Sequence, residues 1–320
     1  MNDFWENKKV IVTGASGFVG SWLCKEMLER KSRVIGIVND KDKIQALINL
    51  GIEKKILVEE ADIRDYEKIK EVFAEHKAEA CFHLAAKAVS NSDNSQYSDF
   101  FEVNVKGTCN VLKACHDAGT KDVLVASTTH VYGNNNSEKM MTEDSELAGR
   151  SGYSLSKIGA EAVMEFFART KNMNVFAIRS SNIYGGNDLN FVRLIPRKIT
   201  DTINKKDPLV IWNGETEIDF VYISDAMEAY LCAMEKADEL KGMKINICSE
   251  KTIKVKDIAG KLIQISKQKT GIKSEGNEKE TRKDRFSNRL AEKILNWQPK
   301  KELEEGLKET YDWYKEYLNK

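Results

Sequence analysis

The sequence predicts an α/β protein built on a doubly wound parallel sheet and followed by a smaller α/β domain. Short runs rich in β-branched residues alternate with longer amphipathic stretches through the first half of the chain. A glycine-rich turn at 14–20 separates the first run from the first amphipathic stretch. Strands that alternate with helices form parallel sheets whose two faces are covered by those helices. We therefore expect a Rossmann-type sheet.

Each element of this sheet is expected from its local pattern. The strands are expected at 10–13, 34–38, 56–59, 80–84, 123–127 and 175–179. The helices between them are expected at 22–30, 44–50, 66–76, 103–118 and 156–171. We expect residues 1–180 to form the dinucleotide-binding domain.

The regular alternation of expected strands and helices ends after residue 179. We expect 181–220 to be irregular and the lysine-rich segment 266–283 to be a solvated loop. Helices are expected at 225–238, 255–268 and 303–318, with a short strand at 245–248. Residues 181–320 are therefore expected to form a substrate-binding domain that is partly interleaved with the first.

The composition is that of an ordinary globular protein. Of the 320 residues, 41% are hydrophobic and 31% charged, and the 50 basic side chains balance 50 acidic ones. Such a balance produces no overall positive field, so we expect no nucleic-acid partner. The apolar runs are too short for a membrane span, and the N-terminal residues do not resemble a signal peptide. We expect a cytoplasmic protein.

Cysteine and histidine spacing gives no support for a metal site. The six cysteines are scattered through apolar contexts without a Cys-x-x-Cys pair, and the four histidines are equally dispersed. Buried free thiols in a reducing compartment explain this pattern best. We predict that no metal is bound.

The turn after the first expected strand carries Gly14, Gly17 and Gly20 immediately before a helix. Glycines at this place allow a tight turn and a close approach of the backbone to a pyrophosphate. The charge of the pyrophosphate is then stabilised by the helix N-terminus. This position between first strand and first helix predicts a bound nicotinamide dinucleotide.

No complete motif marks the residues that would contact the ribose and the adenine of the dinucleotide. An acidic residue is expected about 20 residues after the turn, where the chain has Asn39 and Asp40. Asp40 is equally well explained as a ribose ligand, which favours NAD, or as a solvated turn residue. Asp62, after the third strand, is a candidate for contact with adenine. The sequence leaves NAD and NADP open.

Tyr153 and Lys157 form a pair with catalytic potential. Their i, i+4 spacing places phenol and ammonium on one helix face. A nearby cation favours phenolate, so Lys157 is expected to lower the pKa of Tyr153 and make it a base toward a substrate hydroxyl. Thr128, at the end of a strand, is expected to place a hydroxyl beside the same cleft.

The order of these motifs along the chain resembles the extended short-chain dehydrogenase/reductase family, in its NAD-dependent sugar epimerase/dehydratase group. The resemblance covers essentially the whole chain, and the segments at 4–5, 20–23 and 185–190 are most similar to the CDP-glucose 4,6-dehydratase branch. The matching segments are the glycine turn, 62–65, 83–86, 104–108, Tyr153 with Lys157, 179–185, 219–222 and 297–299.

The resemblance implies a nucleotide-diphosphate sugar as substrate, with oxidation at C4 as the first step. Tyr153 would take the proton of the C4 hydroxyl while hydride leaves C4 for the nicotinamide. Thr128 would orient that hydroxyl, and Lys157 would hold the nicotinamide ribose. The cofactor would contact Gly14, Ser16, Gly17, Phe18, Val19, Gly20, Asn39, Asp40, Asp62, Ile63, Leu84, Ala85, Ala86, Asn104, Tyr153 and Lys157. The substrate would contact Thr129, Asn182, Arg193 and Arg282.

Two departures from the family pattern affect the expected reaction. Many members carry an Arg where this chain has Ile218, so we assign the diphosphate first to Arg282. Many 4,6-dehydratases carry Asp-Glu after the catalytic Thr, and the CDP-glucose branch carries Asp-Lys, where this chain has Thr129 and His130. A dehydratase needs a base for the C5 proton and an acid for the C6 hydroxyl. His130 can supply one of these functions, because imidazole titrates near neutral pH.

Three functions follow, in decreasing order of support. The first is a nucleotide-diphosphate-hexose 4,6-dehydratase, favoured by the branch resemblance. The second is a 4-epimerase, which needs no acid/base pair at C5 and C6. The third is a non-catalytic Rossmann protein that senses cofactor, which the intact Tyr153, Lys157 and Thr128 disfavour.

The resemblance also implies a homodimer formed through the helices near 103–118 and 156–170. Apolar positions on these helices exceed what one face of the sheet can bury. The positions concerned are Val105, Leu112, Val163 and Phe167.

Overall fold

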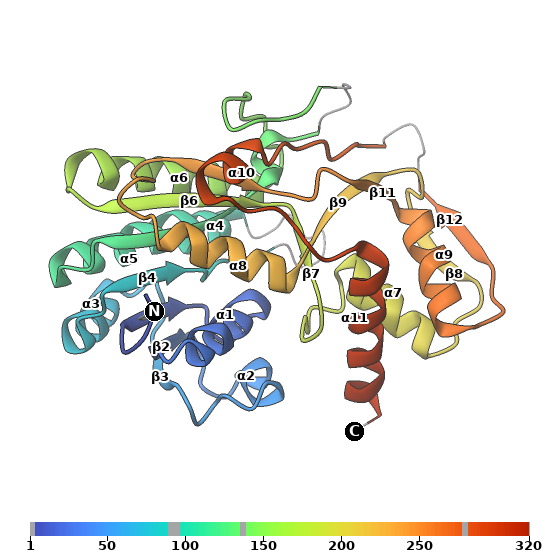
Figure 1. Ribbon diagram of the computed structural model, residues 1–320, viewed down its shortest axis with the longest axis horizontal. Coiled ribbons are helices and arrows are strands. Elements are labelled where there is room, and N and C mark those ends of the chain that lie inside the picture. Colours follow the sequence, from blue (N-terminus) through green and yellow to red (C-terminus); the bar gives the residue numbers. More distant parts are fainter. Residues whose placement is uncertain (1–3, 89–96, 135–138, 277–280, 320) are drawn as a thin grey trace.

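A computed structural model describes residues 4–88, 97–134, 139–276 and 281–319. Its largest element is a seven-stranded parallel sheet in the order β10-β6-β5-β4-β1-β2-β3 (Figure 1). The strands are β1 (Lys9–Thr13), β2 (Arg33–Val38), β3 (Leu57–Glu60), β4 (Ala80–His83), β5 (Asp122–Thr128), β6 (Asn174–Ser180) and β10 (Lys244–Ile247). The expected doubly wound sheet is confirmed, and its first six strands lie within about one residue of the positions expected from the sequence.

Both faces of this sheet are buried. Along β1, Val10 and Val12 belong to one hydrophobic core and Ile11 to the other, as alternation along a strand requires. Helices α1 (Phe18–Glu29), α8 (Ile223–Met234) and α10 (Arg289–Leu295) contribute to the first core. Helices α3 (Tyr66–His76), α5 (Gly107–Ala118) and α6 (Gly152–Thr170) contribute to the second. The short helix α2 (Gln45–Asn49) adds Leu47 to the first core, whereas α4 (Tyr97–Phe101) has no buried residue.

Two expectations for the second part of the chain are wrong. The segment expected to be irregular contains β7 (Asn182–Tyr184), α7 (Leu194–Ile203), β8 (Leu209–Trp212) and β9 (Glu217–Tyr222). The lysine-rich segment expected to be a loop contains β12 (Ile272–Glu275), which pairs with β8. Strand β8 alternates buried and exposed residues and β12 is mostly exposed, so long-range pairing rather than a run of buried apolar residues stabilises these two strands.

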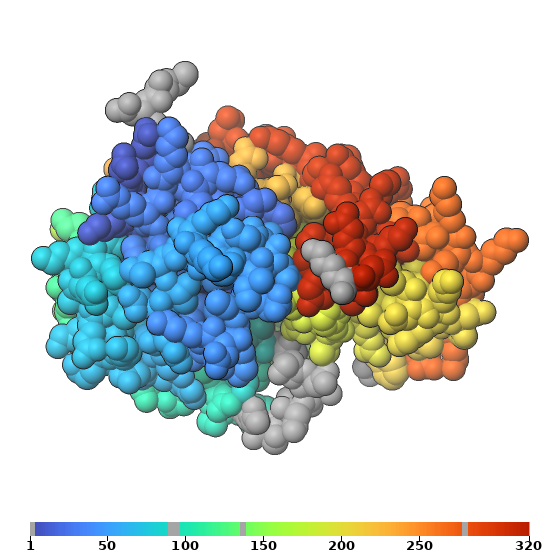
Figure 2. Space-filling model, turned by 90° about the horizontal axis from the view of Figure 1, so that it is seen from below, coloured from blue at the N-terminus to red at the C-terminus, as the bar shows by residue number. Residues whose placement is uncertain are grey.

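The remaining elements form a smaller body around a third hydrophobic core. Strand β9 lies between β7 and β11 (Thr252–Lys254). Helices α7, α9 (Val255–Ser266) and α11 (Leu303–Leu318) pack together beside this sheet (Figure 1). Figure 2 shows this yellow-to-red body next to the larger blue-to-cyan one.

The two bodies exchange segments along the chain. Strand β10 returns from the second half to pair with β6 at the edge of the large sheet, and α8 packs against β5. The boundary at residue 180 remains a prediction, since the later chain contributes to both bodies. In the described part of the chain, no helix combines the length and apolar character that a membrane crossing requires.

Candidate active site

The glycine turn brings the start of α1 against the end of β4. Gly14 has a φ of +70°, and a Cβ there would lie 2.8 Å from the backbone of Ala85. A Cβ on Gly20 would lie 2.1 Å from the carbonyl oxygen of Gly14. Only glycine fits at these two positions, because any side chain would separate the turn from the segment at 84–86. The turn therefore lies at the carboxyl edge of the sheet, where dinucleotides bind in this fold.

A buried chain of hydrogen bonds leads from this turn toward α5. Thr13 Oγ1 accepts from the Ala85 N–H at 3.1 Å and lies 2.8 Å from His83 Nδ1. On the other side of the ring, His83 Nε2 lies 3.0 Å from Thr108 Oγ1, which donates to the Asn104 carbonyl at 2.5 Å. Because the Thr108 proton is used there, His83 Nε2 must donate and Nδ1 must accept. His83 is thus a neutral imidazole with a defined tautomer.

The burial of His83 predicts a specific loss of stability in acid. Burial and the charge of Lys157 lower the pKa of His83 to about 3, whereas an unfolded histidine titrates at about 6.5. The unfolded state therefore binds the extra proton between these values, and stability falls as the pH falls. We expect His83→Gln to reduce the slope of unfolding free energy against pH by about 1.4 kcal/mol per unit between pH 6 and 4. Urea titrations of both proteins would measure it, and equal slopes would contradict the assignment.

Asn104 lies in a π-helical turn (Glu102–Lys106) directly before α5, and such turns often occur at functional sites. Its side-chain oxygen accepts from the Lys87 N–H at 2.8 Å, and its amide donates to the Lys87 carbonyl and to Ser156 Oγ at 3.1 and 2.8 Å. Ser156 donates in turn to the Tyr153 carbonyl at 2.8 Å. The Asn104 side chain therefore connects the segment after β4 with α6, and its contact with the cofactor remains a prediction.

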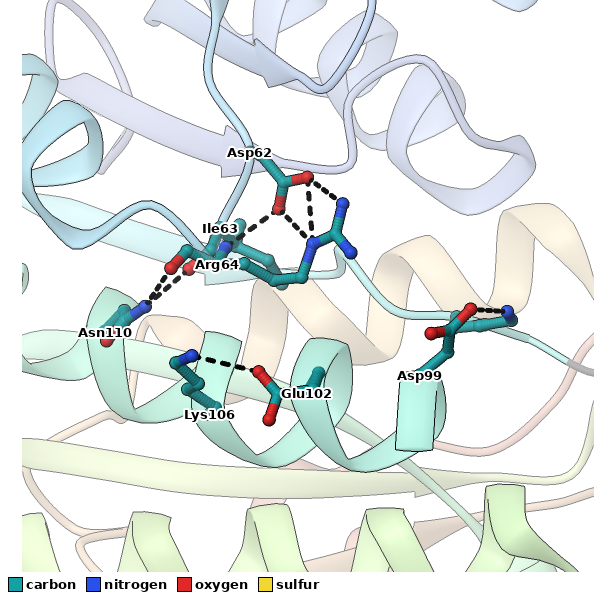
Figure 3. Close-up of polar contacts among 8 residues, drawn as sticks. Asp62, Ile63, Arg64, Asp99, Glu102, Lys106 and Asn110 are labelled. Carbon is teal, nitrogen blue, oxygen red and sulfur yellow. Dashed lines mark hydrogen bonds and ion pairs between the residues drawn. The ribbon is translucent and has the colours of Figure 1, made fainter. Parts of the chain in front are cut away.

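The candidate adenine contact is engaged by a neighbouring arginine. Arg64 forms a bidentate ion pair with Asp62, in which Nη2 lies 2.6 Å from Oδ2 and Nε lies 3.0 Å from Oδ1 (Figure 3). This bonding lowers the pKa of Asp62, so the carboxylate stays charged. Asn110 donates to the Ile63 carbonyl at 2.9 Å and fixes the backbone of this turn. Contact of Asp62 and Ile63 with adenine remains a prediction.

Of the two interpretations of Asp40, its contacts support the turn residue. Its carboxylate accepts from the Asp42 N–H at 2.9 Å and pairs with Lys43 at 2.8 Å. Asn39 beside it is exposed. These contacts lie at the end of β2, where a ribose contact remains a prediction for both residues.

The candidate catalytic pair, Tyr153 and Lys157, lies on α6 as its spacing predicts. Ser151 caps this helix through a reciprocal pair of hydrogen bonds with Ser154, so the helix begins just before Tyr153. Lys157 follows one turn later, donates to the Ala126 carbonyl at 2.8 Å and lies 5.9 Å from the Tyr153 ring centre. Both side chains thus reach the carboxyl end of β5, beside Thr128.

A charge that acts on Tyr153 comes from Arg193. Loss of hydration raises the pKa of Tyr153, and the charge of Arg193 and a hydrogen bond from Thr128 oppose that rise. Burial lowers the pKa of Lys157 to about 8. An effect of Lys157 on the pKa of Tyr153 remains a prediction. An oxidised nicotinamide, when bound, would supply a further positive charge.

Thr128 also connects Tyr153 to His130. Its hydroxyl accepts from the His130 backbone N–H at 3.2 Å, in the short 3-10 turn that follows β5 (Thr129–Tyr132). Burial and the charge of Arg282 lower the pKa of His130 to about 4, although a hydrogen bond with Asn182 opposes this. The imidazole is therefore neutral at pH 7 and can accept a proton but not readily donate one.

The expected substrate contacts do not all lie together. Arg193 pairs with Asp188 at 2.8 Å, and its charge acts on both Tyr153 and His130. Asn182 and Arg282 both act on His130. Thr129 is the exception, since it is fully buried and its hydroxyl lies 3.5 Å from the Ser180 carbonyl. Contact of Thr129 with the substrate remains a prediction.

The sequence analysis did not predict a buried ion pair that joins α6 to β6, between Glu161 and Arg179. Arg179 contacts both carboxylate oxygens of Glu161, at 2.9 and 2.6 Å, and its other nitrogen donates to Tyr132 at 2.8 Å. Ser127 donates to the same Glu161 at 2.5 Å. Glu161 follows Lys157 by one helical turn and opposes the fall in its pKa. The signal in the sequence was a glutamate on the otherwise buried face of the helix.

Known proteins resemble this chain along most of its length. A model described as the NAD dependent epimerase/dehydratase family matches residues 10–248. A dTDP-D-glucose 4,6-dehydratase of Homo sapiens is 29% identical over 97% of this chain and 90% of its own. A CDP-glucose 4,6-dehydratase of Salmonella typhimurium is 25% identical over 99% and 93%. A UDP-glucose 4-epimerase of Thermotoga maritima, solved with UDP-glucose, superimposes with a TM-score of 0.86 at 25% identity, over 97% and 99%.

Proposed function

This chain belongs to the NAD-dependent epimerase/dehydratase family, and from that premise we propose that it is a nucleotide-diphosphate-hexose 4,6-dehydratase. The observation that carries the proposal is the place of His130 in the turn after β5, where its backbone N–H donates to the Thr128 hydroxyl that also hydrogen-bonds Tyr153. A 4-epimerase needs only the group that acts at C4. A neutral imidazole beside that group supplies the additional base that removal of the C5 proton requires.

The cofactor and the first half-reaction rest on the same residues. NAD supplies the hydride acceptor at C4 when it is bound. The open backbone at Gly14 and Gly20 suits its pyrophosphate, and Lys157 lies where it can hold the nicotinamide ribose. Tyr153 then takes the proton of the C4 hydroxyl, which Thr128 orients through its hydrogen bond with the phenol.

A mass-spectrometric screen of nucleotide sugars tests this function. We expect dTDP-glucose or CDP-glucose, the sugars in the names of two relatives, to lose water. An unchanged mass with a new sugar would instead identify the 4-epimerase alternative, which the epimerase of similar structure favours. Absence of turnover on every nucleotide sugar, with cofactor still bound, would favour the sensor alternative.

We also propose a homodimer through α4, α5 and α6. Of the positions considered in the sequence, Leu112 and Phe167 are buried in the core, so they cannot contribute to it. Exposed apolar side chains instead lie at Phe166 and Leu155 on α6 and at Phe101 on α4, with exposures of 53%, 45% and 44%. Exposed aromatic groups of this kind are enriched at interfaces.

Phe166→Glu should convert the dimer into a monomer, because it would place an unpaired charge in that interface. Sedimentation at micromolar concentration would measure the change. Ile48→Glu is the matched control, since Ile48 is equally exposed but lies on α2, and it should leave the dimer intact. A monomeric wild-type protein would rule out the dimer.

We further propose a cytoplasmic location. All six cysteines are free, and Cys24, Cys81, Cys115 and Cys248 are buried. Burial raises the pKa of Cys24 to about 12 and thus keeps the thiol protonated and unreactive. Stable reduced thiols suit a reducing compartment.

A further inference from the structure

Elimination of water across C5 and C6 needs an acid as well as a base. The position that holds an aspartic acid in many 4,6-dehydratases holds Thr129 in this chain. Thr129, which follows the catalytic Thr128, is fully buried and turned toward Ser180. Burial lowers the pKa of His130 to about 4, so at pH 7 its ring is neutral and has no proton to give to the C6 oxygen. The proton for the departing C6 oxygen must therefore come from another part of the chain.

A small pocket beside His130 contains a carboxyl group. The pocket has a volume of about 230 Å³, and among the described residues that line it Asp284 is the sole carboxylic acid. It lies next to Arg282 and faces the same space as His130, Ser151 and Ser154. The pocket thus joins the base, the start of the catalytic helix and one acid that is distant in sequence.

The chain around Asp284 holds it in place. Its backbone N–H donates to the Glu217 carbonyl at 3.0 Å, which ties the segment to β9. Its carboxylate lies 3.2 Å from Arg282 Nε and 3.4 Å from the Asn182 side-chain nitrogen. Because Asn182 also hydrogen-bonds His130, one amide lies between the two groups.

We propose that Asp284 is the general acid that protonates the C6 oxygen as water leaves, a role that rests on the proposed dehydratase function. His130 takes the C5 proton, and the electrons of the C5–H bond form the C5=C6 bond. The C6–O bond then breaks, and the proton of Asp284 completes the water molecule. C6 finally receives the hydride that C4 had given to the bound nicotinamide, and the proton on His130 returns to C5.

The charges around Asp284 suit this role. Burial raises its pKa, whereas Arg282 and the hydrogen bonds from Asp219 N–H and Asn182 lower it. The neighbouring carboxyl of Asp219 is buried beside it, with a pKa raised to about 6. Arg282 is also the residue we assign to the diphosphate. A bound diphosphate that draws away this guanidinium removes the cation nearest to Asp284 and favours its protonated form.

Asp284→Asn tests the proposal on the complete enzyme with bound NAD and dTDP-glucose or CDP-glucose in heavy water. We expect the variant to oxidise C4 and to exchange the C5 proton for deuterium, because Tyr153 and His130 are intact. Loss of water should slow by ~10²–10⁴-fold, the usual effect of removing a general acid. Asp225→Asn is the control, because Asp225 is a buried carboxylate that instead accepts from the Lys300 and Lys301 backbone.

A substrate with fluorine in place of the C6 hydroxyl separates an acid from a structural residue. Fluoride is a weak base and leaves with little help from a proton, so Asp284→Asn should eliminate it at close to the wild-type rate. Equal slowing of both substrates would overturn the proposal, as would unchanged loss of water.

A different outcome reports on the proposed function itself. If the wild type forms an epimer and never loses water, the dehydratase fails and the role of Asp284 fails with it. If Asp284→Asn does not fold, Asp284→Glu keeps the acid and should retain measurable loss of water. Complete loss of that step in a folded Asp284→Glu protein that still exchanges the C5 proton would count against the proposal.

Discussion

Replacing Tyr153 with phenylalanine should abolish hydride transfer while cofactor binding is retained. The ring still packs at the start of α6, and the change removes only the hydroxyl that hydrogen-bonds Thr128. Loss of an acid/base group typically slows a reaction by ~10²–10⁴-fold. The absorbance of reduced cofactor after mixing with a nucleotide sugar measures the step, and calorimetry measures cofactor binding.

A matched substitution distinguishes this effect from a general loss of structure. Tyr66→Phe also removes one phenol hydroxyl, from a tyrosine that contacts Asp117 and Lys113 on the surface of α5. It should leave hydride transfer unchanged. Near wild-type turnover by Tyr153→Phe would remove Tyr153 from the mechanism.

Replacing His130 with alanine should separate the two halves of the reaction. Tyr153, Lys157 and Thr128 still complete oxidation at C4, but no base remains to take the C5 proton. The variant should therefore accumulate reduced cofactor and 4-keto sugar without losing water. Mass spectrometry of the product, together with the cofactor absorbance, measures both effects.

Solvent deuterium gives an independent reading of the same step. Elimination exchanges the C5 proton with solvent, so wild-type product should carry deuterium at C5 and His130→Ala product should not. His116→Ala, an exposed histidine on α5, is the control and should behave like the wild type. A wild-type product free of deuterium at C5 would exclude the dehydratase and leave the epimerase.

Most of the large sheet could be predicted from the sequence. Strands such as β1 and helices such as α3 and α11 bury strongly periodic apolar residues, so local composition and final environment agree. Strands β8 and β12 could not be predicted in the same way. Their pairing joins segments about 60 residues apart. One face of β8 is exposed, and β12 is exposed over most of its length.

In the candidate site, too, some residues could be predicted from local motifs and others could not. Gly14, Gly20, Tyr153 and Lys157 belong to short motifs whose spacing already determines their geometry. The roles of Thr129 and Asp284 could not be deduced from spacing, since they depend on side-chain direction and on a contact between β9 and the segment near residue 284.

The sequence by itself therefore determined the fold class, the place of the glycine turn and the position of Tyr153 and Lys157 on α6. These features depend on interactions within one strand, turn or helix, which neighbouring residues specify. Tertiary structure alone decided that the charge of Arg193 acts on the Tyr153 pKa, and that His130 is neutral at pH 7. It also brought Asp284 into the same pocket. Charge and hydration depend on groups that folding brings together from distant parts of the chain, and local spacing does not encode them.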